Sequence, residues 1–388
     1  MKAYCLNKIS EVALQSLKAP DKTVDNIAEA DSILVRSQAM HDMVLDKNIL
    51  AVARAGAGVN NIPLASYADS GVVVFNTPGA NANAVKELVL CGLLLSSRDI
   101  LGGYQYIQKN IEDEAIAKSA EKAKAKYAGN EIKGKTLAVI GLGVIGVLVA
   151  NAAVDLGMRV IGYDPYLTIN NAMKLAKDIQ YVEKLEAAVQ NADYITIHVP
   201  LTEQTKYMLN QNIFDKLKEN TVLLNFSRDT LVNDKDLKQA MENKKIRKYV
   251  TDFANPEVVR MENVICLPHL GASTAEAEDN CALMAIEEIK DYLENGNITH
   301  SVNYPDLNAG GKQAERRVCI LHKNVPGMIA RFSSFISEQG GNIATLVNKS
   351  KGEYAYSVLD VDGNINDGIL EGLEGVLRVR AVSYTHLR

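Results

Sequence analysis

Three ionisable side chains that lie far apart in the sequence have the chemistry needed to move a proton next to a bound carboxylate. Arg228, Glu257 and His269 each follow a different apolar segment of strand type. An arginine can hold a carboxylate through two parallel hydrogen bonds, and an imidazole can accept a proton near neutral pH. A carboxylate beside the imidazole would orient the ring and raise its pKa by favouring the cation. Together the three groups suit removal of a hydroxyl proton, although each alone can equally be structural.

A glycine-rich segment predicts the partner of such a site. Gly141, Gly143 and Gly146 have the spacing G-x-G-x-x-G and directly follow the apolar segment 136–140. These glycines permit a tight turn and close approach of a pyrophosphate, which the N–H groups of the following helix can hold. A second apolar segment ends at Asp164, where a carboxylate would bind ribose hydroxyls and repel a 2′-phosphate. The pattern therefore predicts binding of NAD in preference to NADP.

Two cations near the beginning of the chain also follow strand-like segments. Arg36 follows residues 32–35, and Arg54 precedes the glycine-rich turn from Gly56 to Gly58. The N–H groups of this turn can bind a carboxylate, while the guanidinium groups supply charge for a phosphate or a second carboxylate. An arginine at a strand end can also be an ordinary solvated charge, and the residues alone leave both interpretations open. The predicted substrate contacts are Arg36, Ser37, Arg54, Ala57, Gly58 and Asn81.

The order of apolar segments and helix patterns predicts the elements that would position these residues. Strands and helices alternate over residues 1–97 and again over residues 131–280, which indicates two doubly wound, Rossmann-like α/β domains with parallel sheets. Ligands bind at the carboxyl ends of such strands. A nearly all-apolar helix over residues 84–101 is expected to be buried between domains, and an alanine- and lysine-rich helix over residues 111–126 to be solvated.

The last part of the chain follows another pattern. After the linker Gly310-Gly311, residues 316–382 have the order strand, helix, strand, strand, helix, strand of a ferredoxin-like βαββαβ fold. An amphipathic helix over residues 275–294 can return the chain to the first domain. The predicted domains are a discontinuous substrate-binding domain of residues 1–97 and 283–308, a nucleotide-binding domain of residues 98–282, and a regulatory domain of residues 316–382.

Composition narrows the class of protein. The 388 residues carry a formal net charge of −5, which gives no basic footprint for nucleic acid or an anionic membrane. No apolar run reaches the length of a membrane span. The five cysteines lack C-x-x-C spacing, so reduced thiols and a cytoplasmic location are expected, and no metal site is predicted.

The motifs together resemble those of the D-isomer-specific 2-hydroxyacid dehydrogenases, most closely the members that end in an ACT domain. The resemblance covers nearly the whole chain, and the combination of motifs is specific. The matching segments are RAGAGVNNI (54–62), GLGVIG (141–146), YDP (163–165), HVPLT (198–202), NFSR (225–228), PHLGAST (268–274), HKNVPGM (322–328) and GGNI (340–343).

The resemblance implies roles for the residues that match. Arg228, Glu257 and His269 correspond to the catalytic arginine, glutamate and histidine, and Asp252 to the acid that contacts the nicotinamide carboxamide. His198, which ends a predicted strand, would border the nicotinamide, although a structural turn is equally consistent with it. The implied coenzyme contacts are Gly141, Gly143, Val144, Ile145, Gly146, Asp164, His198, Val199, Pro200, Thr205, Ser227, Asp252 and Gly271.

The last domain is expected to regulate. His322, Asn324 and Asn342 fall where serine binds in the ACT domains of feedback-inhibited members, so L-serine is a candidate effector. From the residues alone, these side chains can equally cap and turn the backbone. A homo-oligomer, a dimer or a tetramer, is also expected.

The resemblance implies NAD-dependent oxidation of 3-phospho-D-glycerate to 3-phosphohydroxypyruvate, the first step of L-serine biosynthesis. His269 would take the hydroxyl proton, and Arg36 and Arg54 would help to hold the phosphate. A glyoxylate or hydroxypyruvate reductase, or another D-2-hydroxyacid dehydrogenase, is the alternative within the class. A non-catalytic, NADH-sensing protein of the corepressor kind is the alternative outside it.

Three features depart from the family pattern. Asp229 stands where the family usually has glycine, which places a negative charge beside Arg228. Pro256 precedes Glu257, whereas the family glutamate is usually followed by proline, and the span from Glu257 to His269 is short. Residues 383–388 continue no pattern and are set aside as an artificial scar.

Overall fold

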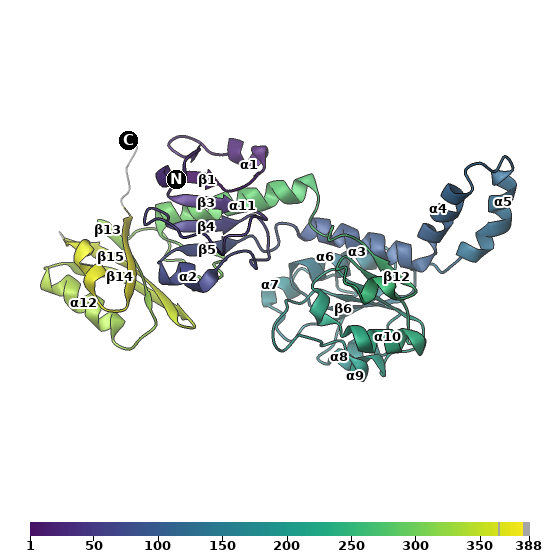
Figure 1. Cartoon of the computed structure of the whole chain (residues 1–388). Coiled ribbons are helices and arrows are strands. Elements are labelled where there is room, and N and C mark those ends of the chain that lie inside the picture. Colours follow the sequence, from purple (N-terminus) through teal and green to yellow (C-terminus); the bar gives the residue numbers. More distant parts are fainter. Residues whose placement is uncertain (364, 383–388) are drawn as a thin grey trace. The chain divides into compact units, whose positions relative to one another are not determined.

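A computed structural model describes residues 1–363 and 365–382, so the tail of residues 383–388 lies outside the described part. The chain forms two compact units (Figure 1). The first contains residues 1–81 and the residues from 275 onward, and the second contains residues 82–274. Two parallel sheets with helices and one antiparallel sheet make up the fold, which confirms the predicted α/β class.

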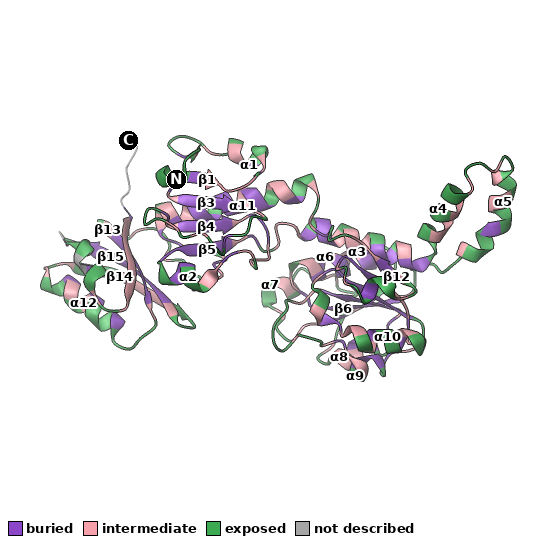
Figure 2. Cartoon of the chain, in the orientation of Figure 1, coloured by how far each residue is buried: buried purple, intermediate pink, exposed green. Residues whose placement is uncertain are grey.

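The first unit contains a five-stranded parallel sheet in the order β2-β1-β3-β4-β5. Strands β3 and β4 are almost entirely buried because helices cover both faces of the sheet, and Figure 2 shows them mainly in purple, the colour of buried residues. Helix α11 packs against β4 through a face that buries Ala285, Ile289 and Tyr292. The elements are β1 (Lys2–Cys5), α1 (Glu11–Gln15), β2 (Lys22–Val24), η1 (Ile27–Glu29), β3 (Ser32–Val35), β4 (Ala51–Arg54), α2 (Leu64–Asp69), β5 (Val73–Asn76) and α11 (Ala275–Asn295).

The ferredoxin-like segment belongs to the same compact unit. Its antiparallel sheet has the order β14-β15-β13-β16, which is the strand order expected for βαββαβ. The second predicted helix is a 3₁₀ segment, η5. The elements are β13 (Arg316–Lys323), α12 (Met328–Glu338), β14 (Asn342–Lys351), β15 (Tyr354–Asp362), η5 (Asp367–Gly372) and β16 (Val376–Val382).

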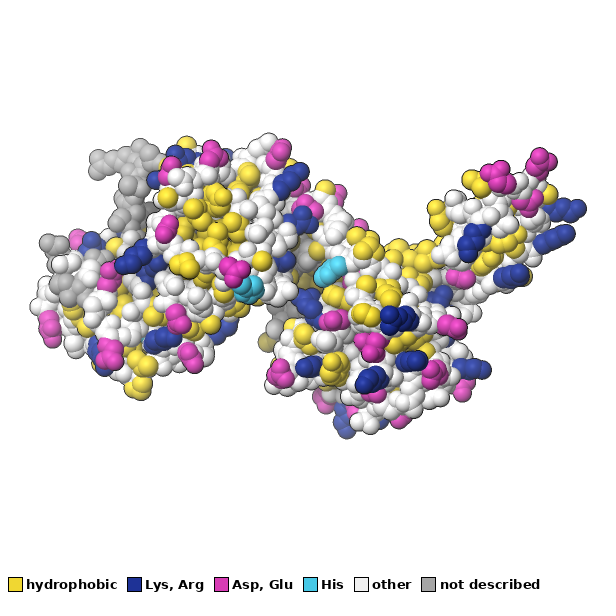
Figure 3. Space-filling view, in the orientation of Figure 1, with side chains coloured by type: hydrophobic (Ala, Val, Ile, Leu, Met, Phe, Trp, Pro, Cys, Tyr) yellow, Lys and Arg dark blue, Asp and Glu magenta, His cyan; other side chains and the backbone are white. Residues whose placement is uncertain are grey.

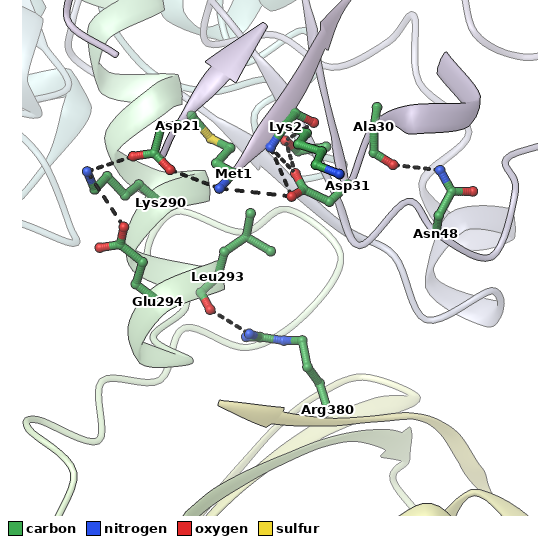
Figure 4. Close-up of polar contacts among 11 residues, drawn as sticks. Met1, Lys2, Asp21, Ala30, Asp31, Asn48, Lys290, Leu293, Glu294 and Arg380 are labelled. Carbon is green, nitrogen blue, oxygen red and sulfur yellow. Dashed lines mark hydrogen bonds and ion pairs between the residues drawn. The ribbon is translucent and has the colours of Figure 1, made fainter. Parts of the chain in front are cut away.

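Polar contacts tie this sheet to the end of α11. Arg380 donates to the carbonyl oxygen of Leu293 at 2.7 Å, and Figure 4 shows this bond together with the Lys290–Asp21 ion pair that joins α11 to the first sheet. Arg317 also donates to the carbonyl oxygen of Asn295 at 2.8 Å. The last carbonyls of a helix have no partner within the helix, so the guanidinium groups satisfy them.

The second unit is built on a seven-stranded parallel sheet in the order β12-β11-β10-β9-β6-β7-β8. The chain leaves β6 for β7 on one side and later returns to β9 on the other, which creates a crevice at the carboxyl ends of these strands. The strands are β6 (Thr136–Ile140), β7 (Arg159–Tyr163), β8 (Gln180–Tyr181), β9 (Tyr194–Ile197), β10 (Thr221–Asn225), β11 (Ile246–Thr251) and β12 (Val264–Cys266). The helices are α3 (Ala82–Ser97), α4 (Ile100–Lys109), α5 (Ile116–Ala123), η2 (Lys124–Tyr127), α6 (Val144–Asp155), α7 (Ile169–Ala172), α8 (Leu185–Val189), α9 (Gln211–Phe214), η3 (Asp229–Leu231), α10 (Asp234–Glu242) and η4 (Val258–Arg260).

Helix α3 shifts the division between the units relative to the sequence prediction. The predicted boundaries at 97/98 and 282/283 lie at 81/82 and 274/275 in the structure. Val85, Val89 and Leu93 of α3 are buried in the same core as α6 and β10, so the helix belongs to the second unit. The single helix predicted over residues 84–101 is two helices, because Asp99 caps the start of α4 by accepting the N–H of Gly102.

No helix among the described residues has both the length and the apolar character to cross a membrane.

Candidate active site

The glycine loop after β6 shows why each of its glycines is needed. Gly141 has a φ of +91°, and a Cβ there would lie 2.5 Å from the carbonyl oxygen of His198. A Cβ on Gly146 would collide with the carbonyl oxygen of Gly141. A Cβ on Gly143 would meet nothing within 4 Å, so this glycine leaves an open side at the start of α6. The loop is therefore closed against its own chain at two positions and open to a ligand at the third.

Asp164 is held in place at the end of β7. One carboxylate oxygen accepts the N–H of Leu142 in the glycine loop, and the other accepts the N–H of Tyr166, both at 2.8 Å. The carboxylate thus joins the end of β7 to the loop that follows β6. Each oxygen keeps a second lone pair, which is what a ribose hydroxyl needs.

His198 follows β9 on the other side of the crevice. Its Nε2 lies 2.9 Å from the hydroxyl of Thr196, whereas its Nδ1 is buried without a hydrogen-bond partner among the described residues. Burial lowers the pKa of His198 to about 3, so the imidazole is neutral at physiological pH. This histidine therefore keeps one buried polar atom that the described residues leave without a partner.

Asp252 follows β11 and shows the same feature. Its side chain is 2% exposed, and its Oδ2 accepts the N–H of Gly271 at 2.9 Å. Its Oδ1 is buried and has no partner among the described residues. A buried carboxylate oxygen without a donor is costly, so a donor from a ligand would complete the site.

These four observations fit the predicted coenzyme. An open cradle at the start of α6 suits a pyrophosphate, the oriented carboxylate of Asp164 suits a ribose, and the unpaired atoms of His198 and Asp252 suit an amide-bearing ring. The rest of the predicted set lies on the loops at this edge of the sheet. Thr205 and Ser227 donate to the carbonyl oxygens of Pro200 and Ile197, at 2.6 and 2.7 Å.

Arg228 lies three residues beyond the end of β10 with its side chain exposed. Its Nη1 donates to the carbonyl oxygen of Ser227 at 2.6 Å. The neighbouring Asp229 is also exposed, and its Oδ1 accepts the N–H of Thr230 at 2.7 Å. The described residues include no ion pair between Arg228 and Asp229, so the aspartate caps its own loop and leaves the guanidinium group to other anions.

His269 lies on the exposed loop after β12. Its ring contacts the ring of Phe253, with centroids 4.8 Å apart and an edge-on angle of 63°. An aromatic ring in this position restricts the orientation of the imidazole.

Glu257 is the predicted hydrogen-bond partner of the His269 imidazole. Glu257 lies at the start of η4, and Asn255 fixes its backbone by accepting the N–H of Glu257 at 3.0 Å. Its side chain lines a pocket of about 650 Å³ together with Lys235, Lys238 and Arg260. No hydrogen bond joins Glu257 to His269 in the part of the chain that the structure describes. The expected bond between carboxylate and imidazole therefore remains a proposal.

The predicted substrate contacts lie at the carboxyl end of β4 and on the loops that follow β3, β4 and β5 in the first unit. Arg36 forms a half-exposed ion pair with Glu278 of α11 at 2.7 Å. The guanidinium group of Arg54 lies over the open face of Gly56, whose φ is +151°. Asn76 donates to the carbonyl oxygen of Ala57 and thereby anchors the glycine-rich turn. Ser37 and Gly58 lie on the loops after β3 and β4, and Asn81 lies on the loop between β5 and α3.

The predicted effector residues separate into two groups. His322 is buried, with Nδ1 2.8 Å from the carbonyl oxygen of Lys323 and Nε2 2.9 Å from the hydroxyl of Ser357. With both ring nitrogens bonded, it holds the antiparallel sheet together in this conformation. Asn324 and Asn342 are exposed.

Three residues at the carboxyl-terminal edge of the seven-stranded sheet were not predicted from the sequence to take part in the site. Asn225 and Asn255 bind the backbone of the loops that carry Arg228 and Glu257, and Phe253 contacts His269. Asn225 has a signal in the sequence, because a polar residue ends an apolar strand there. The other two have none, because their contacts depend on loops brought together by the sheet.

The fold and the site define a class. A doubly wound parallel sheet with a G-x-G-x-x-G loop, an acid at the end of the next strand, and an arginine and a histidine at the same edge is the arrangement of a dinucleotide-binding oxidoreductase. Residues 95–271 match the family model of the D-isomer specific 2-hydroxyacid dehydrogenase, NAD binding domain. The second unit therefore contains an NAD-binding domain of the D-isomer-specific 2-hydroxyacid dehydrogenase type, and NAD is its cofactor.

Several proteins of similar sequence are named D-3-phosphoglycerate dehydrogenase. D-3-phosphoglycerate dehydrogenase of Methanocaldococcus jannaschii is 31% identical over 311 aligned residues, which cover 78% of this chain and 57% of the relative. The chain thus spans little more than half the length of that protein. D-3-phosphoglycerate dehydrogenase of Escherichia coli (strain K12) is 28% identical over 419 aligned residues, which cover 98% of this chain and 97% of the relative.

Solved structures show the same fold. The NAD⁺-bound 3-phosphoglycerate dehydrogenase of Entamoeba histolytica has a TM-score of 0.60 at 25% identity and covers 79% of this chain and 99% of its own. The D-mandelate dehydrogenase of Rhodotorula graminis has a TM-score of 0.64 at 19% identity and covers 80% of this chain and 99% of its own, which shows the fold alone.

Proposed function

We propose that this protein oxidises 3-phospho-D-glycerate to 3-phosphohydroxypyruvate with NAD, the first step of L-serine biosynthesis. One observation carries the proposal. Arg228, Asp252 and His269 follow β10, β11 and β12, which are neighbouring parallel strands, so all three lie at the edge that also bears the glycine loop. The names of the relatives from M. jannaschii and E. coli support the choice of substrate.

Each residue has a role in this proposal. Arg228 binds the substrate carboxylate through its planar fork and polarises the neighbouring carbon–oxygen bond. His269 takes the hydroxyl proton as the C2 hydride leaves, and Glu257 orients the imidazole. NAD, when bound, accepts the hydride. Arg36 and Arg54 hold the phosphate group, which requires Arg36 to exchange its ion pair with Glu278 for the ligand.

A single substitution tests the mechanism. Because His269 supplies the base, His269→Ala should lower kcat by about 10²- to 10⁴-fold, the usual contribution of a general base. The dissociation constant of NADH should stay within about twofold, since none of the described coenzyme-edge contacts involves the imidazole. NADH production from 3-phosphoglycerate, measured beside D-lactate, glycerate, glyoxylate and hydroxypyruvate, also separates the proposed substrate from the alternatives within the class. Full activity of the variant would refute the mechanism, and absence of turnover with every substrate would favour an NADH sensor.

We also propose that the chain forms a homo-oligomer through α4. None of the ten residues of this helix is buried, and Tyr104 in it is 62% exposed. Ile107 and, just after the helix, Ile111 are exposed as well, and Figure 3 shows apolar surface in this region. A second copy of the chain would cover such a patch. Tyr104→Lys combined with Ile107→Glu should halve the mass measured by light scattering or reduce it further, and an unchanged mass would contradict this assignment.

Finally, we propose a cytoplasmic location and regulation by L-serine through an ACT domain. All five cysteines are free thiols, which suits a reducing compartment. Exposed Asn324 and Asn342 are the contacts that this proposal retains for the effector, whereas His322 supports them from within the sheet.

A further inference from the structure

We propose that Asn225 and Tyr249 are positioning residues that set the place of Arg228. The inference rests on the proposed function, in which Arg228 binds the substrate carboxylate. Neither residue reaches the substrate itself, because Asn225 is fully buried and Tyr249 is 2% exposed.

One buried amide bonds to both ends of the turn that carries Arg228. The Nδ2 atom of Asn225, the last residue of β10, donates to the carbonyl oxygen of Arg228 at 2.8 Å. Its Oδ1 accepts the N–H of Ser227 at 3.1 Å. The turn therefore closes on the side chain of the strand from which it departs.

The orientation of this amide is fixed by its partners. If the amide were reversed, its NH₂ group would face the N–H of Ser227 and its oxygen would face the carbonyl of Arg228. The second N–H of Asn225 points to the hydroxyl of Tyr249 on the neighbouring strand β11, at 3.2 Å. Burial raises the pKa of Tyr249, so it remains a neutral phenol that can accept this bond.

The chain beyond Arg228 is held from the other side. The carbonyl oxygens of Thr230 and Leu231 accept the N–H groups of Tyr207 and Leu209, at 2.8 and 3.1 Å. Arg228 is thus an exposed side chain on a backbone that is fixed at both ends. The carbonyl oxygen of Arg228 accepts the Asn225 amide at 2.8 Å and the N–H of Leu231 only at 3.5 Å, so loss of the shorter bond to Asn225 should move the guanidinium group.

The first test removes only the hydroxyl. Tyr249→Phe keeps the ring in the core and leaves one amide N–H of Asn225 unpaired, so kcat/KM for the hydroxy acid should fall by up to about tenfold. The KM for NAD should change by less than about twofold. Tyr194→Phe is the matched control: Tyr194 is also buried, on β9 of the same sheet, but its hydroxyl has no hydrogen-bond partner among the described residues, and kcat/KM should not change. Equal losses in both variants would overturn the proposal.

The second test removes the amide. Asn225→Ala should lower kcat/KM by about a hundredfold, the scale of a catalytic group displaced by about 1 Å. Asn225→Asp keeps the acceptor for Ser227 but turns a second oxygen towards the carbonyl of Arg228, so it should not restore activity. Asn210→Ala, which removes an asparagine that caps α9 in a similar way, should leave activity unchanged.

A double-mutant cycle separates positioning from general loss of stability. In an Arg228→Lys background, which retains the charge but not the fork, Tyr249→Phe should lower kcat/KM by less than about twofold, while its effect on the melting temperature stays the same. A tenfold loss in both backgrounds would show that Tyr249 acts independently of Arg228 and would refute the proposal. If the unmodified protein fails to turn over any 2-hydroxy acid with NAD, the proposed function fails first, and this inference fails with it.

Discussion

Two histidines, His198 in the second unit and His322 in the first, show how the coenzyme edge differs from the antiparallel sheet. His322 has partners at both ring nitrogens, the carbonyl oxygen of Lys323 and the hydroxyl of Ser357. His198 has Thr196 at one nitrogen, but its Nδ1 is buried and unpaired among the described residues. Burial lowers the pKa of both. The hydrogen bonds of the His322 ring are therefore complete, whereas those of the His198 ring are not.

Two buried aspartates repeat the contrast. Both oxygens of Asp360 bind the guanidinium group of Arg317, at 2.7 and 2.9 Å. Asp252 binds the N–H of Gly271 through one oxygen and leaves the other without a donor. Because buried polar groups are normally paired, the unpaired atoms of His198 and Asp252 beside the glycine loop suit completion by a ligand, whereas the paired atoms of Asp360 hold the chain to itself.

The largest expected effect is the loss of stability when the buried Arg317–Asp360 ion pair is broken. Asp360→Ala leaves the charge of Arg317 buried without its partner and should lower the free energy of unfolding by about 3–5 kcal/mol, without changing the dissociation constant of NADH. Urea unfolding and fluorescence titration measure the two quantities. Replacing both residues, as Arg317→Met with Asp360→Leu, should recover most of the stability. If Asp360→Ala lost NADH binding but kept its stability, the roles assigned to Asp360 and Asp252 would be contradicted.

At the coenzyme edge, a substitution is expected to weaken NADH binding and to leave the free energy of unfolding nearly unchanged. Asp252→Asn keeps an acceptor for Gly271 but loses the charge, so NADH should bind about tenfold more weakly while the free energy of unfolding changes little. Asp193→Asn is the matched control, because Asp193 accepts the N–H of Thr136 at the amino-terminal edge of the same sheet. Equal weakening in the control would show that charge anywhere on the unit matters, rather than the unpaired oxygen of Asp252.

A smaller effect should appear in the pH dependence of stability. The folded pKa of His198, about 3, lies below its ordinary value of 6.5, so the unfolded chain binds more protons between these values. His198 therefore contributes its full stability above pH 6.5, and this contribution is lost as the pH falls towards 3. His198→Gln should flatten the curve of unfolding free energy against pH over this range. His322→Gln should flatten it as well, because the pKa of His322 is lowered too. Unaltered curves would contradict the assignment of two imidazoles that stay neutral in the folded protein.

Much of the fold could be predicted because the pattern of each element is local. The strands Ser32–Val35 and Thr136–Ile140 have the predicted bounds, since each is a short apolar run that ends at a turn or polar residue. The exposed two-residue strand β8 could not be seen in this way, because its strand character depends on pairing with β7. The predicted domain boundary at residue 97 differs from the division at 81/82 for a similar reason, because the sequence shows that α3 is apolar but not which core it joins.

The features of the candidate site also divide into those that are local in the sequence and those that depend on contacts with other strands. The sequence by itself determined the types of side chain at the strand ends and the glycine spacing, because backbone geometry and hydrogen-bonding chemistry dictate them within a few residues. Only the tertiary structure decided which polar atoms are left unpaired, that His322 lies inside the sheet, and that Asn225 and Tyr249 hold the turn of Arg228. These facts depend on partners from other strands, and burial gives them their energetic weight.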